Sequence, residues 1–155
     1  MSGKLASEIK QTKPWSSLEE EVALNVQRTA AVLEQALEET LKPHGITATQ
    51  YNALRIIRGS GNRGISCQEA GTRMIRTEPD LTRLFDRLEA RGMVVRSRSA
   101  KDRRLVLVCL SPAGIKLLAS LDGVVTELHQ RTLGPMGDRK LRQLRDLSEE
   151  ARNFE

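Results

Sequence analysis

Residues 81–114 hold a helix, a tight turn and a charged hairpin in immediate succession. Four apolar side chains recur at helical spacing in the first part and so share one face of a helix: Leu81, Leu84, Phe85 and Leu88. Gly92 follows, and glycine ends a helix at little cost because it accepts positive φ. Two β-rich runs, residues 94–98 and 105–110, then flank a polar tip at residues 99–104. This order predicts an amphipathic helix followed by a two-stranded hairpin with an exposed tip.

The residues before this helix predict where it begins. Thr77 stands three residues before Asp80, a spacing that suits capping, and Pro79 in a first turn has no amide group to leave unpaired. The helix is therefore expected to begin near Thr77. Four polar side chains would then lie off its apolar face: Thr82, Arg83, Asp86 and Arg87.

Apolar spacing and capping residues predict five further helices. Their expected ranges are about 18–41, 48–58, 67–74, 112–132 and 141–155. Ser66 and Glu69 form a capping box before the 67–74 helix, which predicts a helix-turn-helix over residues 66–90. The apolar stripes of the terminal helices exceed what a domain of this size needs for its own core. Two copies are therefore expected to associate, with ordinary packing inside one chain as the alternative.

An ordered set of motifs runs through the same region. Residues 82–92 read TRLFDRLEARG, residues 102–104 read DRR and residues 111–114 read SPAG. This set resembles the MarR-type winged-helix transcriptional regulators, from about Trp15 to the end of the chain. The resemblance implies a mainly α fold with a small β-hairpin wing, an α+β arrangement in which N- and C-terminal dimerisation helices flank a winged helix-turn-helix.

The expected organisation follows from that resemblance and from the predicted helices. Residues 1–14 would be a flexible N-terminus. Residues 15–45 and 112–155 would form a helical dimerisation region, and residues 46–111 the DNA-binding winged helix-turn-helix, all within one compact domain.

Charge is distributed unevenly along the chain. The formal net charge is +5, with a sequence pI near 9.6. Residues 58–104 hold twelve Lys or Arg and six Asp or Glu, a net +6, whereas residues 16–39 hold six Glu and one Arg, a net −5. Solubility alone could account for such an asymmetry. The coincidence of the basic block with the predicted helix and hairpin tip favours a phosphate-binding face.

Named side chains are expected to carry the contacts with duplex DNA. Arg83 is the candidate for a base edge, because a guanidinium can bond guanine O6 and N7 together. The resemblance implies that Arg104 enters the minor groove, with Asp102 steadying its guanidinium. The other candidates would hold phosphate or sugar: Ser66, Gln68, Thr77, Thr82, Arg87, Lys101 and Arg103. For each arginine the alternative is a solvated charge or an intrahelical pair, such as Arg83 with Asp80 or Asp86.

The expected function is a sequence-specific DNA-binding regulator, a ligand-responsive repressor that acts as a homodimer on a palindromic operator. A winged helix used as a protein-interaction module is the alternative. The resemblance also implies an apolar pocket between the dimerisation helices and the winged helix, for a small aromatic or phenolic anion. Trp15, His44, Tyr51 and Arg55 are the candidates to line it, although a lone aromatic on a helix is more often a core residue.

Other function classes find little support in the sequence. No nucleophile–base pair, metal cluster or Gly-rich phosphate loop is recognisable, so neither an enzyme nor a cofactor nor a bound metal is expected. The sequence shows no signal peptide or membrane-spanning run, which favours a cytoplasmic protein. Cys67 and Cys109 are expected to be free thiols, and Cys67 is the better redox candidate because it opens a helix near several arginines.

Overall fold

The computed structural model describes residues 3–153, which form a mainly helical protein with one small sheet. The helices are α1 (Leu5–Glu8), α2 (Leu18–Leu41), α3 (Ala48–Gly59), α4 (Cys67–Thr72), α5 (Leu81–Ala90), α6 (Pro112–Leu133) and α7 (Gly137–Glu150). The strands are β1 (Ile65–Ser66), β2 (Val94–Arg98) and β3 (Val106–Leu110). The predicted fold class, mainly α with a β-hairpin, is confirmed.

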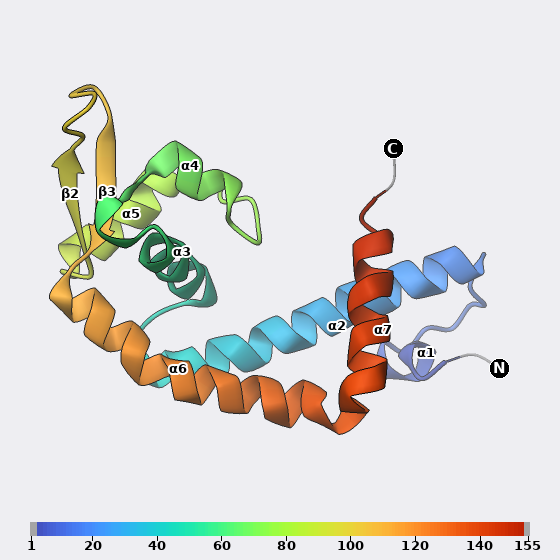
Figure 1. The fold of residues 1–155 in the computed structure, drawn as a ribbon. Coiled ribbons are helices and arrows are strands. Elements are labelled where there is room, and N and C mark those ends of the chain that lie inside the picture. Colours follow the sequence, from blue (N-terminus) through green and yellow to red (C-terminus); the bar gives the residue numbers. More distant parts are fainter. Residues whose placement is uncertain (1–2, 154–155) are drawn as a thin grey trace.

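The elements divide into a winged part and an extended helical part (Figure 1). Helices α3, α4 and α5 gather around the β2–β3 hairpin at one end of the molecule. The long helices α2 and α6 lead away from them, and α1 and α7 lie at the opposite end. The winged part is therefore displayed at a distance from both ends of the chain.

The three strands form an antiparallel sheet in the order β1-β3-β2. Ile65 pairs with Val108 on one side of β3, and Val94 pairs with Leu110 on the other. Strand β1 was not predicted, because two residues are too few to show an alternating pattern. It connects the hairpin to the residues that begin α4, so that the wing and the helix-turn-helix share one sheet.

The hydrophobic core lies in the winged part and continues along α6. The side chain of Phe85 is fully buried, as is that of Leu88 one turn later. Other fully buried members come from α3, β3 and α6: Leu54, Ile57, Val108, Leu118 and Leu121. The apolar face of α5 therefore packs against this core, and its opposite face is exposed to solvent.

Helix α5 begins at Leu81, and the predicted start near Thr77 is wrong. Asp80 is the N-cap, and its Oδ1 accepts a hydrogen bond from the amide of Arg83 at 2.9 Å. Pro79 precedes this cap instead of occupying the first turn, and a proline disfavours helical backbone at the residue before it, Glu78. The shorter helix moves Arg83 into the first turn, where the unpaired amides of the helix are.

Most other predicted helix ends are confirmed. Helix α2 ends at Leu41, before Pro43, and α3 carries the complete capping box of Thr47 and Gln50. Ser111 caps α6, whose first residue is Pro112. Gly92 takes φ +70° after α5, as its predicted role requires. Helix α4 ends at Thr72, two residues earlier than expected. Helix α7 spans Gly137–Glu150 instead of the expected 141–155, of which residues 154 and 155 lie outside the described range.

Residues 3–14, which belong to the segment expected to be flexible, contain a short helix. Residues 5–8 form α1, and the side chain of Leu5 is only 3% exposed. Two polar contacts tie this segment to α2: the amide of Gly3 donates to Glu21, and Glu8 pairs with Arg28. Leu5 is the buried apolar residue of this mainly polar segment.

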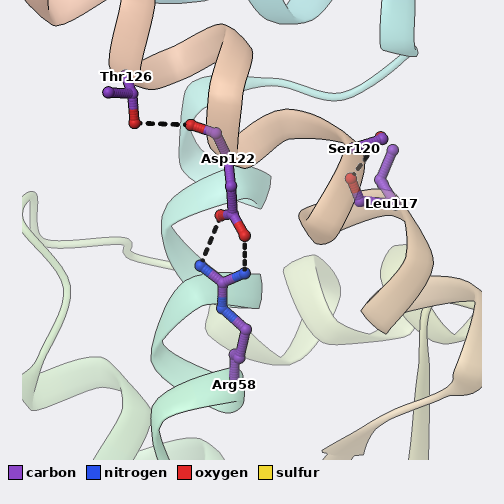
Figure 2. Close-up of polar contacts among 5 residues, drawn as sticks. All are labelled: Arg58, Leu117, Ser120, Asp122 and Thr126. Atoms are coloured by element: carbon purple, nitrogen blue, oxygen red, sulfur yellow. Dashed lines mark hydrogen bonds and ion pairs between the residues drawn. The ribbon is translucent and has the colours of Figure 1, made fainter.

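A bidentate ion pair connects the winged part to α6 (Figure 2). Both terminal nitrogens of Arg58, on α3, donate to the two carboxylate oxygens of Asp122 at 2.9 Å. The hydrogen bonds from Arg58 lower the pKa of Asp122, and they raise the pKa of Arg58. Because both side chains are more than a third exposed, the pair contributes at most about 1 kcal/mol to stability. It orients α3 relative to α6 more than it stabilises the fold.

Apolar side chains on the extended helices remain exposed. In the first half of α2 the exposed fractions are 70% for Leu18, 50% for Val22 and 58% for Val26. On α7, Leu147 is 62% exposed, and no residue of that helix is buried. These surfaces lack a cover within residues 3–153. None of the helices in that range combines the length and the apolar character needed to cross a bilayer.

Candidate nucleic-acid interface

The exposed face of α5 carries the polar residues that the sequence predicted. Thr82, Arg83 and Arg87 are exposed, whereas Leu84 and Phe85 beside them are buried. Among the described residues the guanidinium of Arg83 forms no ion pair. The alternative of an intrahelical pair is therefore not realised, and Arg83 is free to contact a ligand.

The wing tip, residues 99–104, is ordered by its own hydrogen bonds. Ser99 is only 9% exposed, and its Oγ accepts from the amides of Lys101 at 3.2 Å and Asp102 at 3.4 Å. The guanidinium of Arg98 donates to the carbonyl oxygen of Arg103 at 2.9 Å. The polar run thus forms a compact turn with Lys101, Arg103 and Arg104 exposed around it.

The predicted role of Asp102 requires correction. Its Oδ1 accepts from the backbone amide of Arg104 at 2.9 Å and does not hold the guanidinium of that residue. The carboxylate bonds the main chain two residues along, a local turn that Asp side chains commonly form. Asp102 therefore fixes the backbone from which the Arg104 side chain extends.

The other candidate residues differ in whether they lie at the start of a helix. Ser66 caps α4, since its Oγ accepts from the amide of Glu69 at 3.1 Å, and Gln68 is exposed in the first turn of that helix. Thr77 precedes the α5 cap and lines a cavity, so it does not form part of the helix start. Arg91 donates to the carbonyl oxygen of Gly45, which ties the end of α5 to the α2–α3 connection.

Arg96 was not singled out by sequence reasoning, and it joins the wing to α5. One of its terminal nitrogens lies 2.6 Å from Asp86 Oδ1 and 3.2 Å from Glu89 Oε2. The hydrogen bond to Asp86 is the main cause that raises the pKa of Arg96. The only signal in the sequence was an arginine in a short strand that follows a helix with two acidic residues.

A cavity of about 620 Å³ lies between the winged part and the long helices. Its walls come from α2, α3, α6 and the segment that connects α4 to α5. Most of the lining is apolar, as with Leu33, Leu37 and Leu128. Its polar members include Arg76, His129, Glu34 and Glu78. Arg76 forms an ion pair with Glu34 of α2 at this cavity.

The four residues predicted to line a pocket lie elsewhere. Tyr51 is 5% exposed in the core, and the guanidinium of Arg55 lies 5.9 Å from the centroid of its ring. His44 ends the short 3-10 helix after α2, and Trp15 is half-buried ahead of α2. None of the four lines the cavity. These four were proposed because they are aromatic or basic. Residues 74–78, which do line the cavity, were instead assigned to the end of one predicted helix and the start of the next.

The cysteines are free thiols, as predicted, and both are half-buried. Burial raises the pKa of Cys67, and the opposing effect of Arg96 is smaller. A raised pKa disfavours the thiolate, the form that reacts with oxidants. The described residues contain no group of three His, Cys, Asp or Glu side chains placed to hold a metal ion.

Comparisons with known proteins identify relatives of this chain. Residues 46–106 match the model of the MarR family. A MarR transcription factor from Planctomyces limnophilus is 37% identical, with a TM-score of 0.66 over 88% of this chain and 98% of that one. A mutant of MarR from E. coli, solved in complex with operator DNA, is 27% identical, with a TM-score of 0.78 over 88% and 99% of the two chains.

A curated relative gives the same assignment over a shorter range. The HTH-type transcriptional regulator TtmR of Methylorubrum extorquens (strain PA1) is 32% identical over 106 residues, which is 68% of this chain. The match spans about half of TtmR, 53% of its length. With the fold, the exposed α5 face and the wing already described, these matches show that the chain belongs to the MarR family of winged-helix, DNA-binding transcriptional regulators.

Proposed function

We propose that this protein represses transcription by binding duplex DNA through α5 and the wing. The observation that carries the proposal is that two neighbouring elements each present an exposed arginine. Arg83 lies in the first turn of α5, and Arg104 lies at the tip of the hairpin that packs beside α5. A helix fits the major groove and a narrow arginine-bearing loop fits the minor groove, so the two could read adjacent grooves.

Ser66, Gln68, Thr82, Arg87, Lys101 and Arg103 would hold phosphate or sugar in this arrangement. Thr77 keeps only a secondary place, because it stands away from the α5 start. Residues 46–111 would form the DNA-binding region. The protein would act in the cytoplasm and without a catalytic role.

The DNA-bound form would be a homodimer. The exposed apolar side chains of Leu18, Val22 and Val26 on α2 and of Leu147 on α7 offer the surface for it. Residues 15–45 and 112–155 would supply this interface. A two-fold symmetric dimer would present two α5 helices about 34–36 Å apart, the spacing of one turn of duplex, and so would require a palindromic operator.

The first prediction concerns salt. The logarithm of the operator association constant is expected to fall linearly with the logarithm of the salt concentration, with a slope of about −0.9 for each phosphate neutralised. Duplexes selected from random sequence, then footprinted and titrated in salt, provide the measurement. Selection of no preferred duplex, or binding that salt leaves unchanged, would contradict DNA readout and favour a protein-interaction module.

The cavity supports a response to a small effector. A volume of about 620 Å³ with mainly apolar walls suits an aromatic ring. An anionic group on that ring would compete with Glu34 for the guanidinium of Arg76. Residues 74–78 line the cavity, and Asp80, the cap of α5, follows two residues later. A ligand that moved this segment would therefore shift the start of α5 and weaken DNA binding.

The second prediction tests this cavity with a panel of hydroxybenzoates. A bound anion is expected to raise Tm, because a ligand that binds only the folded state stabilises it, and to weaken operator binding. Arg76→Gln should bind the anion about tenfold more weakly, as the loss of one charge-assisted hydrogen bond implies. Calorimetric titration measures the anion affinity of the original protein and of Arg76→Gln, and thermal denaturation measures Tm.

Arg55→Gln is the matched control, since Arg55 is exposed and lies outside the cavity. It should leave anion binding unchanged. Loss of anion binding in Arg55→Gln with retention in Arg76→Gln would place the effector at the residues that the sequence alone suggested.

A further inference from the structure

Arg96 makes the ion pairs that join the hairpin to α5. It lies on β2, its side chain is 25% exposed, and one nitrogen reaches both Asp86 and Glu89 on α5. Within the sheet Arg96 pairs with Val108, which is fully buried. The arginine therefore extends from a fixed point of the hairpin to the solvent-facing side of the helix.

The two carboxylates on α5 would otherwise oppose DNA binding. Asp86 stands three residues after Arg83, a spacing at which helix side chains are neighbours and opposite charges attract. An unpaired Asp86 could hold the Arg83 guanidinium and would also repel phosphate. Asp86 is engaged by Arg96 at 2.6 Å, and within residues 3–153 Arg83 forms no ion pair.

The same contact constrains the wing. The hairpin that begins with β2 carries Arg104 at its tip, and Arg83 lies on the helix at the other end of the ion pair. A rotation of the hairpin relative to α5 would have to break the Arg96 contacts with Asp86 and Glu89. Arg96 thus limits how far apart the two DNA-contacting arginines can move.

We propose that Arg96 is a positioning residue for DNA binding, which holds Asp86 and Glu89 against β2, leaves Arg83 free and sets its placement relative to Arg104. The inference rests on the proposed function, since it concerns how α5 and the wing meet DNA together. It assigns no DNA contact to Arg96 itself.

The third prediction is a thermodynamic cycle built from Arg96→Gln, the double variant Asp86→Asn/Glu89→Gln and the triple variant. Arg96→Gln should weaken operator binding about 5- to 50-fold, the range expected for coupled contacts, with an unchanged salt slope. The double variant should also weaken binding, even though it removes two negative charges near the DNA. The triple variant should lose no more than Arg96→Gln alone.

A direct phosphate contact by Arg96 predicts a different pattern. Arg96→Gln would then reduce the magnitude of the salt slope by about 0.9 for each subunit, and the double variant would bind more tightly than the original protein. Either result would overturn the inference. If the original protein selects no duplex at all, it is the proposed function that fails instead.

Control variants and a denaturation curve test whether Arg96→Gln acts only through folding. Lys116→Gln removes one positive charge from an exposed position on α6 and should leave the affinity unchanged. Arg96→Lys keeps the charge and should recover part of the loss while the salt slope stays constant. If the affinity loss of Arg96→Gln vanishes once the concentration of folded dimer, determined from a denaturation curve, is used, Arg96 is only structural and the inference is wrong.

Discussion

Arg83→Ala is expected to weaken operator binding by about 1–3 kcal/mol at each half-site, the value of one bidentate contact with guanine. Two half-sites would make the loss about 2–6 kcal/mol in a symmetric dimer. The expectation follows from the position of Arg83 in the first turn of α5, exposed and outside any ion pair in residues 3–153. Affinities for the operator and for operators with single guanine replacements measure the loss.

The discrimination matters more than the affinity in that experiment. Arg83→Ala should bind the original operator and one single-base variant equally well, because the residue that distinguishes them is missing. Arg87→Ala, on the same exposed face of α5, is the matched control. It should weaken binding to all duplexes alike and reduce the magnitude of the salt slope by about 0.9 for each subunit. If Arg83→Ala instead behaves in that uniform way, Arg83 contacts phosphate and the base-reading role is wrong.

Phe85→Ala is expected to destabilise the fold by about 3–5 kcal/mol. The ring of Phe85 is fully buried in the core beneath α5, so that alanine would leave a cavity among Leu54, Leu88 and their neighbours. Proteins of this size are stable by only about 5–15 kcal/mol, so the change removes a large fraction of the total. Chemical denaturation at one fixed protein concentration gives the value, because dimer stability depends on concentration.

Thr82→Ala serves as the control for that measurement. Thr82 lies on the exposed side of α5, where substitutions change stability by no more than about 0.5 kcal/mol. Comparable losses for Phe85→Ala and Thr82→Ala would mean that α5 is not packed through the face described above.

Local sequence patterns predicted the helices and the hairpin well, because their signals lie within a few residues. The apolar spacing of α5, the capping box at Thr47 and the positive φ at Gly92 each depend on neighbours in the chain. The start of α5 was misplaced since Thr77 and Asp80 are both good caps and only the tertiary structure decides between them. Asp80 is the cap, and Thr77 faces the cavity.

Single residues of the site could be proposed from the sequence, whereas contacts between distant segments could not. Arg83 was proposed from its place on the predicted helix and Arg104 from the family resemblance, and both stay predictions. The contact of Arg96 with Asp86 joins a strand to a helix and depends on the angle between them, which no local pattern encodes. The cavity walls come from four separate parts of the chain, so Arg76 and His129 could not be grouped before the fold was known.

The most direct test of the account is the reaction of the operator with dimethyl sulfate, which methylates guanine N7 in the major groove and adenine N3 in the minor groove. The bound protein should protect guanine N7 within each half-site and adenine N3 beside it. Arg83→Ala should lose only the first protection, and Arg104→Ala only the second. Protection of a single groove by the original protein, or an identical pattern in both variants, would contradict the claim that α5 and the wing read adjacent grooves.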